Sequence, residues 1–176
     1  MQIRDASEAD LPAILEITNE AILHTTAIWS LTPTTLEARR GWLHERRRRD
    51  FPVFVAAEGA SVLGFASYGD FRPWEGYLHT VEHSLYVDRR HRGRGVGKAL
   101  LQRLVAHASE AGKHAMVAGI TSDNAVSLHL HLAFGFSEMG RLSEVGWKFE
   151  RWLDLVLLER LLEPSGADRR GAPLCR

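Results

Sequence analysis

The sequence predicts an α/β protein of the α+β kind, with a mixed, mostly antiparallel central sheet and helices on both faces. Helical and strand patterns alternate along the 176 residues. Consecutive strand patterns in the first half are joined by tight turns, which favours antiparallel neighbours. The composition, 45% hydrophobic and 25% charged, suits one domain with a sizeable core.

The first elements are a short strand at residues 2–4 and a helix that Ser7 caps and that ends near His24. Apolar residues recur along this helix at helical spacing. The following loop, residues 25–33, carries unusually large apolar side chains, including Trp29. It either covers the core, or forms a wall of a substrate site or a dimer contact.

A second helix begins after Thr34 or Thr35 and turns Leu36, Trp42 and Leu43 inward. It ends in four consecutive arginines, residues 46–49. Cations stabilise helix C-termini, and acidic residues lie nearby. The run is therefore interpreted as a solvated helix end rather than an anion-binding patch.

The rest of the chain alternates strands and helices. Gly59 predicts a hairpin between its two neighbouring strands, and a turn-rich loop covers residues 69–77. The predicted strands are 53–58, 62–68, 80–87, 115–120, 136–142 and 152–158, and the predicted helices run from 96 to about 112 and from 124 to 134.

The domain organisation follows from composition. Residues 1–162 are predicted to form a single domain, and residues 163–176, rich in Pro, Gly, Ala and Arg, a flexible C-terminal tail. Balanced charge, with 22 basic and 22 acidic residues, argues against a nucleic-acid partner. The single cysteine, Cys175, excludes an intrachain disulfide and a cysteine metal cluster. Without a signal pattern or a membrane-length apolar run, the expected location is the cytoplasm, with no membrane partner.

A basic, glycine-rich loop follows the strand at 80–87. Gly93, Gly95 and Gly97 allow backbone N–H groups to turn toward one anion. The helix N-terminus behind them and the neighbouring arginines add positive charge. Lys98 stands where a dinucleotide fingerprint needs its third glycine, and the spacing does not match a P-loop. The loop is therefore interpreted as a pyrophosphate-binding loop.

Arg92-x-x-Gly95-x-Gly97 resembles the R/Q-x-x-G-x-G/A motif of the GCN5-related N-acetyltransferases (GNAT), and the resemblance covers about residues 2–160. It implies the GNAT fold, acetyl-CoA as co-substrate and no metal. It also implies that the strands at 80–87 and 115–120 splay apart to admit the pantetheine arm. The cofactor-binding residues it implies are Leu85, Tyr86, Val87, Arg92, Gly93, Arg94, Gly95, Val96, Gly97, Lys98, Asn124 and Ser127.

Residues 124–136 resemble the family's N-x-x-A-x-x-x-Y-x-x-x-G-F segment. Ser127 stands where alanine is common. His131 stands where many members carry the tyrosine that protonates the departing thiolate, so either His131 is the acid or there is none. His129 and His131 point about 200° apart on a helix, which disfavours a shared metal.

Four further segments look like the phosphinothricin and methionine-sulfoximine acetyltransferase subfamily. They are residues 25–29, 67–74, 80–87 and 147–149. In that subfamily the T-V-E segment supplies a glutamate at the substrate amine, and Glu82 matches it. The resemblance implies that small amino-acid analogues, such as L-phosphinothricin or L-methionine sulfoximine, are acetylated on the α-amine. We expect a homodimer.

Acetyl transfer to an amine needs a base, because an α-ammonium is protonated at pH 7. Glu82 shares a strand face with Ser84 and Tyr86 and is the candidate base; the alternative is an ordinary salt bridge. Backbone N–H groups from Leu85 to Val87 are expected to bond the thioester carbonyl. Alternation puts His83 on the opposite face, which favours a packing role for its side chain.

For the acceptor, Arg72 is the best cation to bind a carboxylate or phosphinyl group. Aromatic residues are candidates for apolar walls, each with a purely structural alternative. The residues predicted to contact the acceptor are Trp29, Arg72, Pro73, Trp74, Tyr77, Glu82, His83 and Ser84.

The predicted function is direct acetyl transfer from acetyl-CoA to a small amino acid, with Glu82 as base. Within the same activity, the acceptor could instead be a protein N-terminus, a polyamine or an aminoglycoside. The acids near the site alternate with Arg72, which disfavours a polycation. A different class is a non-catalytic acyl-CoA-binding sensor, against which the presence of Glu82 argues.

Overall fold

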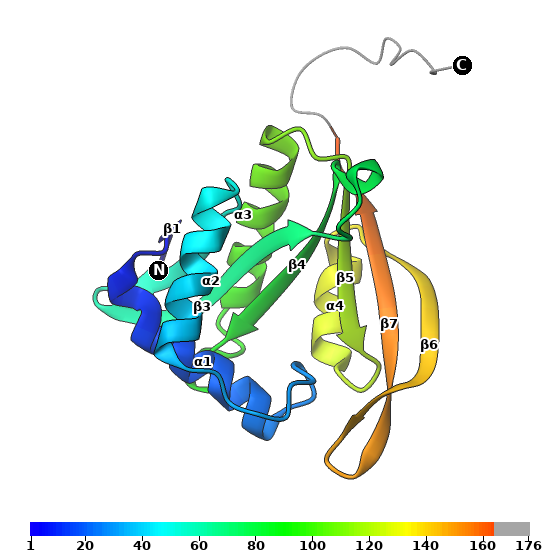
Figure 1. Cartoon of the computed structure of the whole chain (residues 1–176), viewed down its shortest axis with the longest axis horizontal. Coiled ribbons are helices and arrows are strands. Elements are labelled where there is room, and N and C mark those ends of the chain that lie inside the picture. Colours follow the sequence, from blue (N-terminus) through cyan, green and yellow to red (C-terminus); the bar gives the residue numbers. More distant parts are fainter. Residues whose placement is uncertain (164–176) are drawn as a thin grey trace.

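The computed structural model describes residues 1–163 and shows a sheet with helices on both faces. In this part of the chain, seven strands pair in the order β1-β2-β3-β4-β5-β7-β6 (Figure 1). The predicted tail, apart from Glu163, lies outside the described residues. The strands are β1 (Gln2–Asp5), β2 (Val53–Glu58), β3 (Ser61–Asp70), β4 (Thr80–Val87), β5 (Ala115–Thr121), β6 (Ser137–Lys148) and β7 (Arg151–Leu161).

The sheet is antiparallel except where β4 and β5 run parallel, which confirms the predicted mixed sheet. These two strands pair only from Thr80 opposite Ala115 to Glu82 opposite Val117. Beyond that point β4 continues to Val87 without β5 beside it, and Figure 1 shows the two strands diverging. The expected splay is therefore present, and Glu82 lies where it begins.

The helices cover both faces of the sheet, as predicted. Helices α1 (Leu11–His24) and α2 (Leu36–Arg48) pack on one face, and α3 (Val96–Glu110) and α4 (Ala125–Ala133) on the other. Helix α1 is preceded by a short 3-10 turn, Glu8–Asp10, so the α-helix itself starts later than the Ser7 cap predicted.

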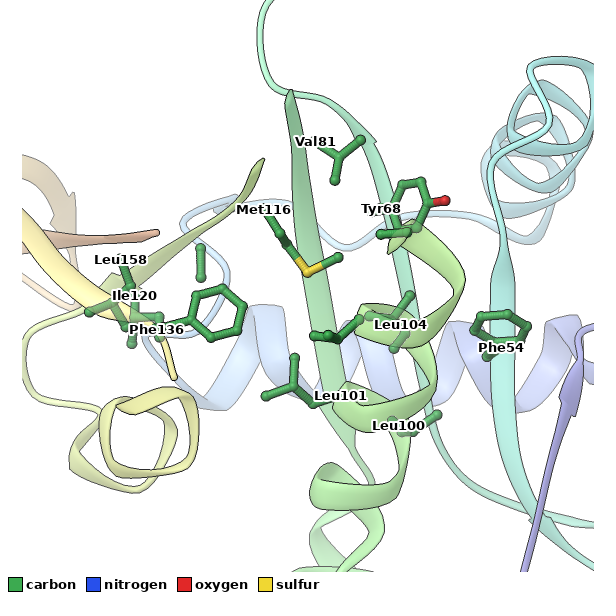
Figure 2. Close-up of a cluster of buried hydrophobic side chains, with 14 of the residues drawn as sticks. Phe54, Tyr68, Val81, Leu100, Leu101, Leu104, Met116, Ile120, Phe136 and Leu158 are labelled. Carbon is green, nitrogen blue, oxygen red and sulfur yellow. The ribbon is translucent and has the colours of Figure 1, made fainter. Parts of the chain in front are cut away.

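The main core lies between the sheet and α3. Leu100, Leu101 and Leu104 are fully buried and belong to one cluster with the strand residues Tyr68 and Met116 (Figure 2). Burial of this continuous apolar face follows from the helical spacing of these leucines. A smaller cluster under α1 and α2 contains Leu11, Ile14, Leu43, Val55 and Phe65.

The arginine run at the end of α2 is not uniformly solvated, so that prediction is wrong for Arg46. Its side chain lies over Gly69 and against the Phe51 ring, and its Nε is buried with no hydrogen-bond partner among the described residues. Arg48 is exposed and pairs with Glu45. The physical reason is helix geometry, because one position of the run faces the sheet while its neighbours face solvent.

Strands β6 and β7 are longer than predicted, and their pairing contains two register shifts. Glu144, at one of these irregularities, has φ 54°, and the connecting turn places Phe149 and Glu150 at φ 52° and 58°. Left-handed backbone at non-glycine residues has no simple sequence signal. The pattern therefore predicted two short strands where the structure has one long hairpin.

Candidate active site

The glycine loop, residues 92–97, ends at the N-terminus of α3. Gly93 and Gly95 have φ 75° and 79°, a left-handed conformation that glycine adopts at little cost. Gly95 is the N-cap of α3 and supplies no capping side chain, so the first N–H groups of the helix are free to bind an anion. A Cβ built on Gly93 or Gly95 would meet no atom within 4 Å, so the space above the loop is open.

The arginines of this loop are held by acidic neighbours. Arg92 pairs with Glu20 on α1 at 3.2 Å, and Arg94 pairs with Glu58 on β2 at 3.0 Å. These pairs are exposed and position the loop more than they stabilise the fold. The side chain of Val96 is buried in the core, so its backbone N–H is the group it can offer a ligand. Lys98 is exposed and has no ion-pair partner among the described residues.

The free edge of β4 also presents backbone donors. The N–H of Asp88 donates to the carbonyl of Leu63 on β3. Alternation along an antiparallel strand then turns the N–H groups of Leu85 and Val87 away from β3, toward the splay. On the other side, Asn124 caps α4, with Oδ1 accepting from the N–H of Ser127 at 3.2 Å. The N-termini of α3 and α4 thus both follow strand ends at the open end of the splay.

Glu82 occupies the point where β4 and β5 separate. Its Oε2 lies 4.0 Å from Nη1 of Arg72, and its Oε1 lies 3.5 Å from the position of a Cβ on Gly119 of β5. Partial burial raises the pKa of the Glu82 carboxyl group, and the charge of Arg72 partly opposes this. A partly buried carboxylate with a raised pKa is suited to accept a proton near neutral pH.

Arg72 belongs to the segment that joins β3 to β4. Its Nη1 donates to the carbonyl of Phe71 at 2.8 Å, and its guanidinium lies 4.1 Å from the centre of the Phe71 ring. These contacts hold the guanidinium beside Glu82. Trp74 and Tyr77 follow, with ring centres 6.3 Å apart, and both rings are exposed. Pro73 between Arg72 and Trp74 is also exposed.

Trp29 connects the loop after α1 to the far side of the splay. Its Nε1 donates to Oγ1 of Thr121 at 3.0 Å, and its ring lies so close to Gly146 that a Cβ there would overlap it. Lys148 is buried, and its Nζ donates to the carbonyls of Thr25 at 2.7 Å and Ile28 at 2.5 Å. Burial lowers the pKa of the Lys148 ammonium group.

The sequence pattern did not predict that Lys148 and Trp29 attach the loop after α1 to the rest of the protein. Lys148 belongs to a segment that resembles the subfamily, but its carbonyl partners are more than a hundred residues away. Of the alternatives for residues 25–33, the structure therefore favours a wall beside the splay over a loop that only covers the core.

His83 and His131 form a buried pair on the opposite face of β4 from Glu82. Their rings stack with centres 5.0 Å apart, and their Nε2 atoms are 3.1 Å apart. Nδ1 of His131 lies 2.7 Å from the Ser127 carbonyl, which can only accept, so His131 is protonated at Nδ1 and its Nε2 accepts from His83. Burial lowers the pKa of both imidazoles, that of His83 to about 3.

These bonds decide what the pair can do. Both nitrogens of neutral His131 are occupied, so it has no proton to offer toward the splay. The side chain of His83 packs against Phe136 in the core, 5.7 Å between ring centres. The geometry therefore supports the packing role for His83, and neither an acceptor contact by His83 nor an acid role for His131.

Ser84 and Tyr86 share the Glu82 face of β4. Both line a cavity of about 370 Å³ between the sheet and the helices α1 and α2. Residues 1–163 contain no group of three or more His, Cys, Asp or Glu side chains arranged to hold a metal ion. No helix among these residues has the length and apolar character to cross a membrane. The absence of a metal and of nucleic-acid or membrane partners, and the cytoplasmic location, stay predictions.

Comparisons with known proteins agree with this architecture. The sequence profile of the Acetyltransferase (GNAT) family matches residues 14–136. The L-methionine sulfoximine/L-methionine sulfone acetyltransferase of Pseudomonas paraeruginosa is 50% identical over 172 residues, 97% of this chain and 98% of that protein.

Two solved structures are similar over nearly the whole chain. Ribosomal-protein-alanine N-acetyltransferase from Brucella melitensis has a TM-score of 0.91 at 49% identity and covers 92% of this chain and 100% of that chain. The phosphinothricin acetyltransferase of Sinorhizobium meliloti, solved with acetyl-CoA, has a TM-score of 0.89 at 33% identity, with 93% and 92% covered. Together with the splay, the glycine loop and the family match, these similarities show that the chain is an N-acetyltransferase and belongs to the GNAT family.

Proposed function

We propose that this enzyme transfers the acetyl group of acetyl-CoA to the α-amine of small amino-acid analogues such as L-methionine sulfoximine, L-methionine sulfone or L-phosphinothricin. One observation carries the proposal: Glu82 and Arg72 lie 4.0 Å apart at the start of the splay. An amino acid carries an ammonium and a carboxylate on one carbon atom, and this pair of side chains matches both. The names of the relatives support the same class of acceptor.

The chain's own groups fit acetyl-CoA. The open glycine loop and the uncapped N-terminus of α3 suit a pyrophosphate. The N–H groups of Leu85 and Val87 and the α4 N-terminus at Asn124 line the splay beside it. Bound there, acetyl-CoA supplies an acetyl thioester.

The protein's part in the reaction is positioning and proton transfer. Arg72 binds the acceptor's carboxylate in its guanidinium fork and thereby directs the α-ammonium to Glu82. Glu82 accepts a proton from the ammonium, which leaves the amine a nucleophile. We assign no protonating acid to the departing thiolate, because His131 is fully bonded within the core. The transfer needs no covalent enzyme intermediate.

The proposal is tested by thiol release from acetyl-CoA over a panel of amines. We expect methionine sulfoximine, methionine sulfone and phosphinothricin to exceed spermidine, an aminoglycoside and a short peptide with an N-terminal alanine at least tenfold in kcat/KM. The decarboxylated counterpart of each amino acid serves as the matched control and should react poorly. A higher kcat/KM for the peptide or the polycations than for the amino acids overturns the proposed acceptor class. Binding of acetyl-CoA without thiol release for any amine of the panel supports the acyl-CoA sensor instead.

We also propose a homodimer. The β6–β7 hairpin carries seven large apolar side chains that are each at least 46% exposed, and the Trp147 and Trp152 rings lie 4.9 Å apart. Apolar side chains gathered in this way on one hairpin are typical of an interface. Light scattering should give twice the chain mass for the wild type and the single mass for Trp152→Glu. A wild type that is monomeric at micromolar concentration contradicts this assembly.

A further inference from the structure

The cavity beside β4 has an unusual lining for a space under two helices. Six of its lining residues carry hydroxyl groups, and none of the described residues that line it is acidic. Ser84 and Tyr86 contribute from β4, and Thr18 from α1. The volume of about 370 Å³ is within the range of small-molecule sites. A packing defect in an apolar core would be lined by hydrocarbon instead.

Among the described residues that line this cavity, Arg39 of α2 is the only charged one. Its guanidinium lies 4.9 Å from the centre of the Trp42 ring, and its Nε is buried without a hydrogen-bond partner. No ion pair joins Arg39 to any described residue, whereas the adjacent Arg40 pairs with Glu8 and Glu37. A partly buried cation without a carboxylate is costly to the fold, and a bound anion would offset that cost.

The cavity lies next to the proposed reaction centre along β4, because its lining residue Ser84 is two residues from Glu82. Glu82, Ser84 and Tyr86 follow one another on the same face, and two residues of a strand span about 6.6 Å. An extended side chain of methionine length covers such a distance. An acceptor whose amine lies at Glu82 therefore has room to extend its side chain past Ser84 toward Arg39.

We propose that this cavity receives the side chain of the acceptor amino acid and that Arg39 binds the oxygen atoms at its end. The inference rests on the proposed function, since it requires the α-amine at Glu82 and the α-carboxylate at Arg72. Sulfone, sulfoximine and phosphinate groups all present oxygen atoms that a guanidinium fork can bind. The thioether of methionine offers none. Arg39 is thus a specificity-determining residue that selects an oxidised or anionic side-chain end.

The test compares kcat/KM for L-methionine sulfone and L-methionine, which differ only in the two sulfone oxygens. The variants are Arg39→Met, Arg39→Lys and the matched control Arg48→Met, an exposed arginine of the same helix that pairs with Glu45. Arg39→Met should reduce the sulfone preference at least about tenfold, mainly through the KM of the sulfone. Arg39→Lys should give an intermediate preference, and it keeps the test open if Arg39→Met unfolds. Arg48→Met should leave the preference unchanged.

Three results overturn the inference. The first is an unchanged sulfone preference in Arg39→Met, and the second is a wild type without such a preference. The third is an equal loss of kcat/KM for both amino acids in Arg39→Met, together with loss of the preference for the amino acids over their decarboxylated amines. The last result places the α-carboxylate, not the side chain, at Arg39. Failure of the proposed function gives a different result: the wild type acetylates neither amino acid but releases thiol with another amine. That result also overturns the inference.

Discussion

The two faces of β4 carry different kinds of side chain. His83 and Leu85 point to the α3 side, where the core is apolar and closed. Glu82, Ser84 and Tyr86 point to the α1–α2 side, which holds a carboxylate, a hydroxyl-lined cavity and the partly buried Arg39. In the proposed function, one strand therefore contributes stability through one set of alternate residues and chemistry through the other. Substitutions on the two faces should be separable by measuring unfolding and turnover in the same variants.

The largest effect should come from the α1–α2 face. Glu82→Gln should lower kcat about 10²–10⁴-fold, the usual loss for a general base, with little change in acetyl-CoA affinity or in the free energy of unfolding. Since burial raises the pKa of the Glu82 carboxyl group, wild-type kcat/KM should fall with decreasing pH through a pKa above the ordinary 4.5. Glu110→Gln, an exposed partner of Arg103 on α3, is the control. Near-full turnover of Glu82→Gln at pH 7 would remove Glu82 as base.

The next effect should come from the α3 face and reverse the pattern. Leu104 is fully buried, so Leu104→Ala should lower the free energy of unfolding by about 2–5 kcal/mol in urea titrations. At low temperature, where the variant remains folded, its kcat should stay close to that of the wild type. Leu132→Ala on α4, an exposed position, should change stability by less than about 0.5 kcal/mol. A large loss of kcat in folded Leu104→Ala would contradict the separation of the two faces.

A smaller effect should follow from removing the cation beside Glu82. Arg72→Ala should raise KM for methionine sulfone and shrink its advantage over the decarboxylated amine, at a cost of about 1–3 kcal/mol in transition-state binding. Arg49→Ala removes a surface arginine that pairs with Asp70 and should change neither quantity. If the advantage over the decarboxylated amine survives in Arg72→Ala, another group binds the carboxylate.

The smallest effect concerns the buried imidazole pair. His83 has a pKa of about 3 when folded and near 6.5 when unfolded, so the unfolded chain binds more protons as the pH falls below 6.5. Stability from this group is therefore complete above pH 6.5 and decreases by about 1 kcal/mol between pH 6.5 and 5.5. His83→Phe should lose this part of the pH dependence, and His129→Gln, at an exposed position, should retain it. Equal slopes for wild type and His83→Phe would contradict the assignment.

The features that the sequence predicted best depend on residues that lie close together in the chain. The glycine loop and the apolar spacing of α3 lie within a few residues of one another, and both elements form where expected. The run of four arginines misled because charge alone does not say which side chain faces the sheet. Helical spacing carries that information: Arg39, Leu43 and Arg46 are three or four residues apart and share one face of α2.

Contacts between segments far apart in the chain could not be predicted from local sequence spacing. His83 and His131 are 48 residues apart, and their mutual hydrogen bond depends on how α4 packs against β4. The sequence suggested an acid at His131 because it stands at a tyrosine position, but only the fold shows that its ring is turned into the core. Arg39 was missed as a cavity residue for the same reason, since the cavity is lined by α1, α2, β3, β4 and the loop between the two helices.

The bond between Lys148 and the loop after α1 has a consequence for how the enzyme is made. Lys148 follows Thr25 by 123 residues, and a ribosome adds about 5–20 residues per second, so the two groups emerge roughly 6–25 s apart. The strands and helix that carry the glycine loop are complete well before the last hairpin leaves the ribosome. During synthesis the glycine loop is therefore available to fold first, and the loop that contains Trp29 is among the last parts to be fixed in place.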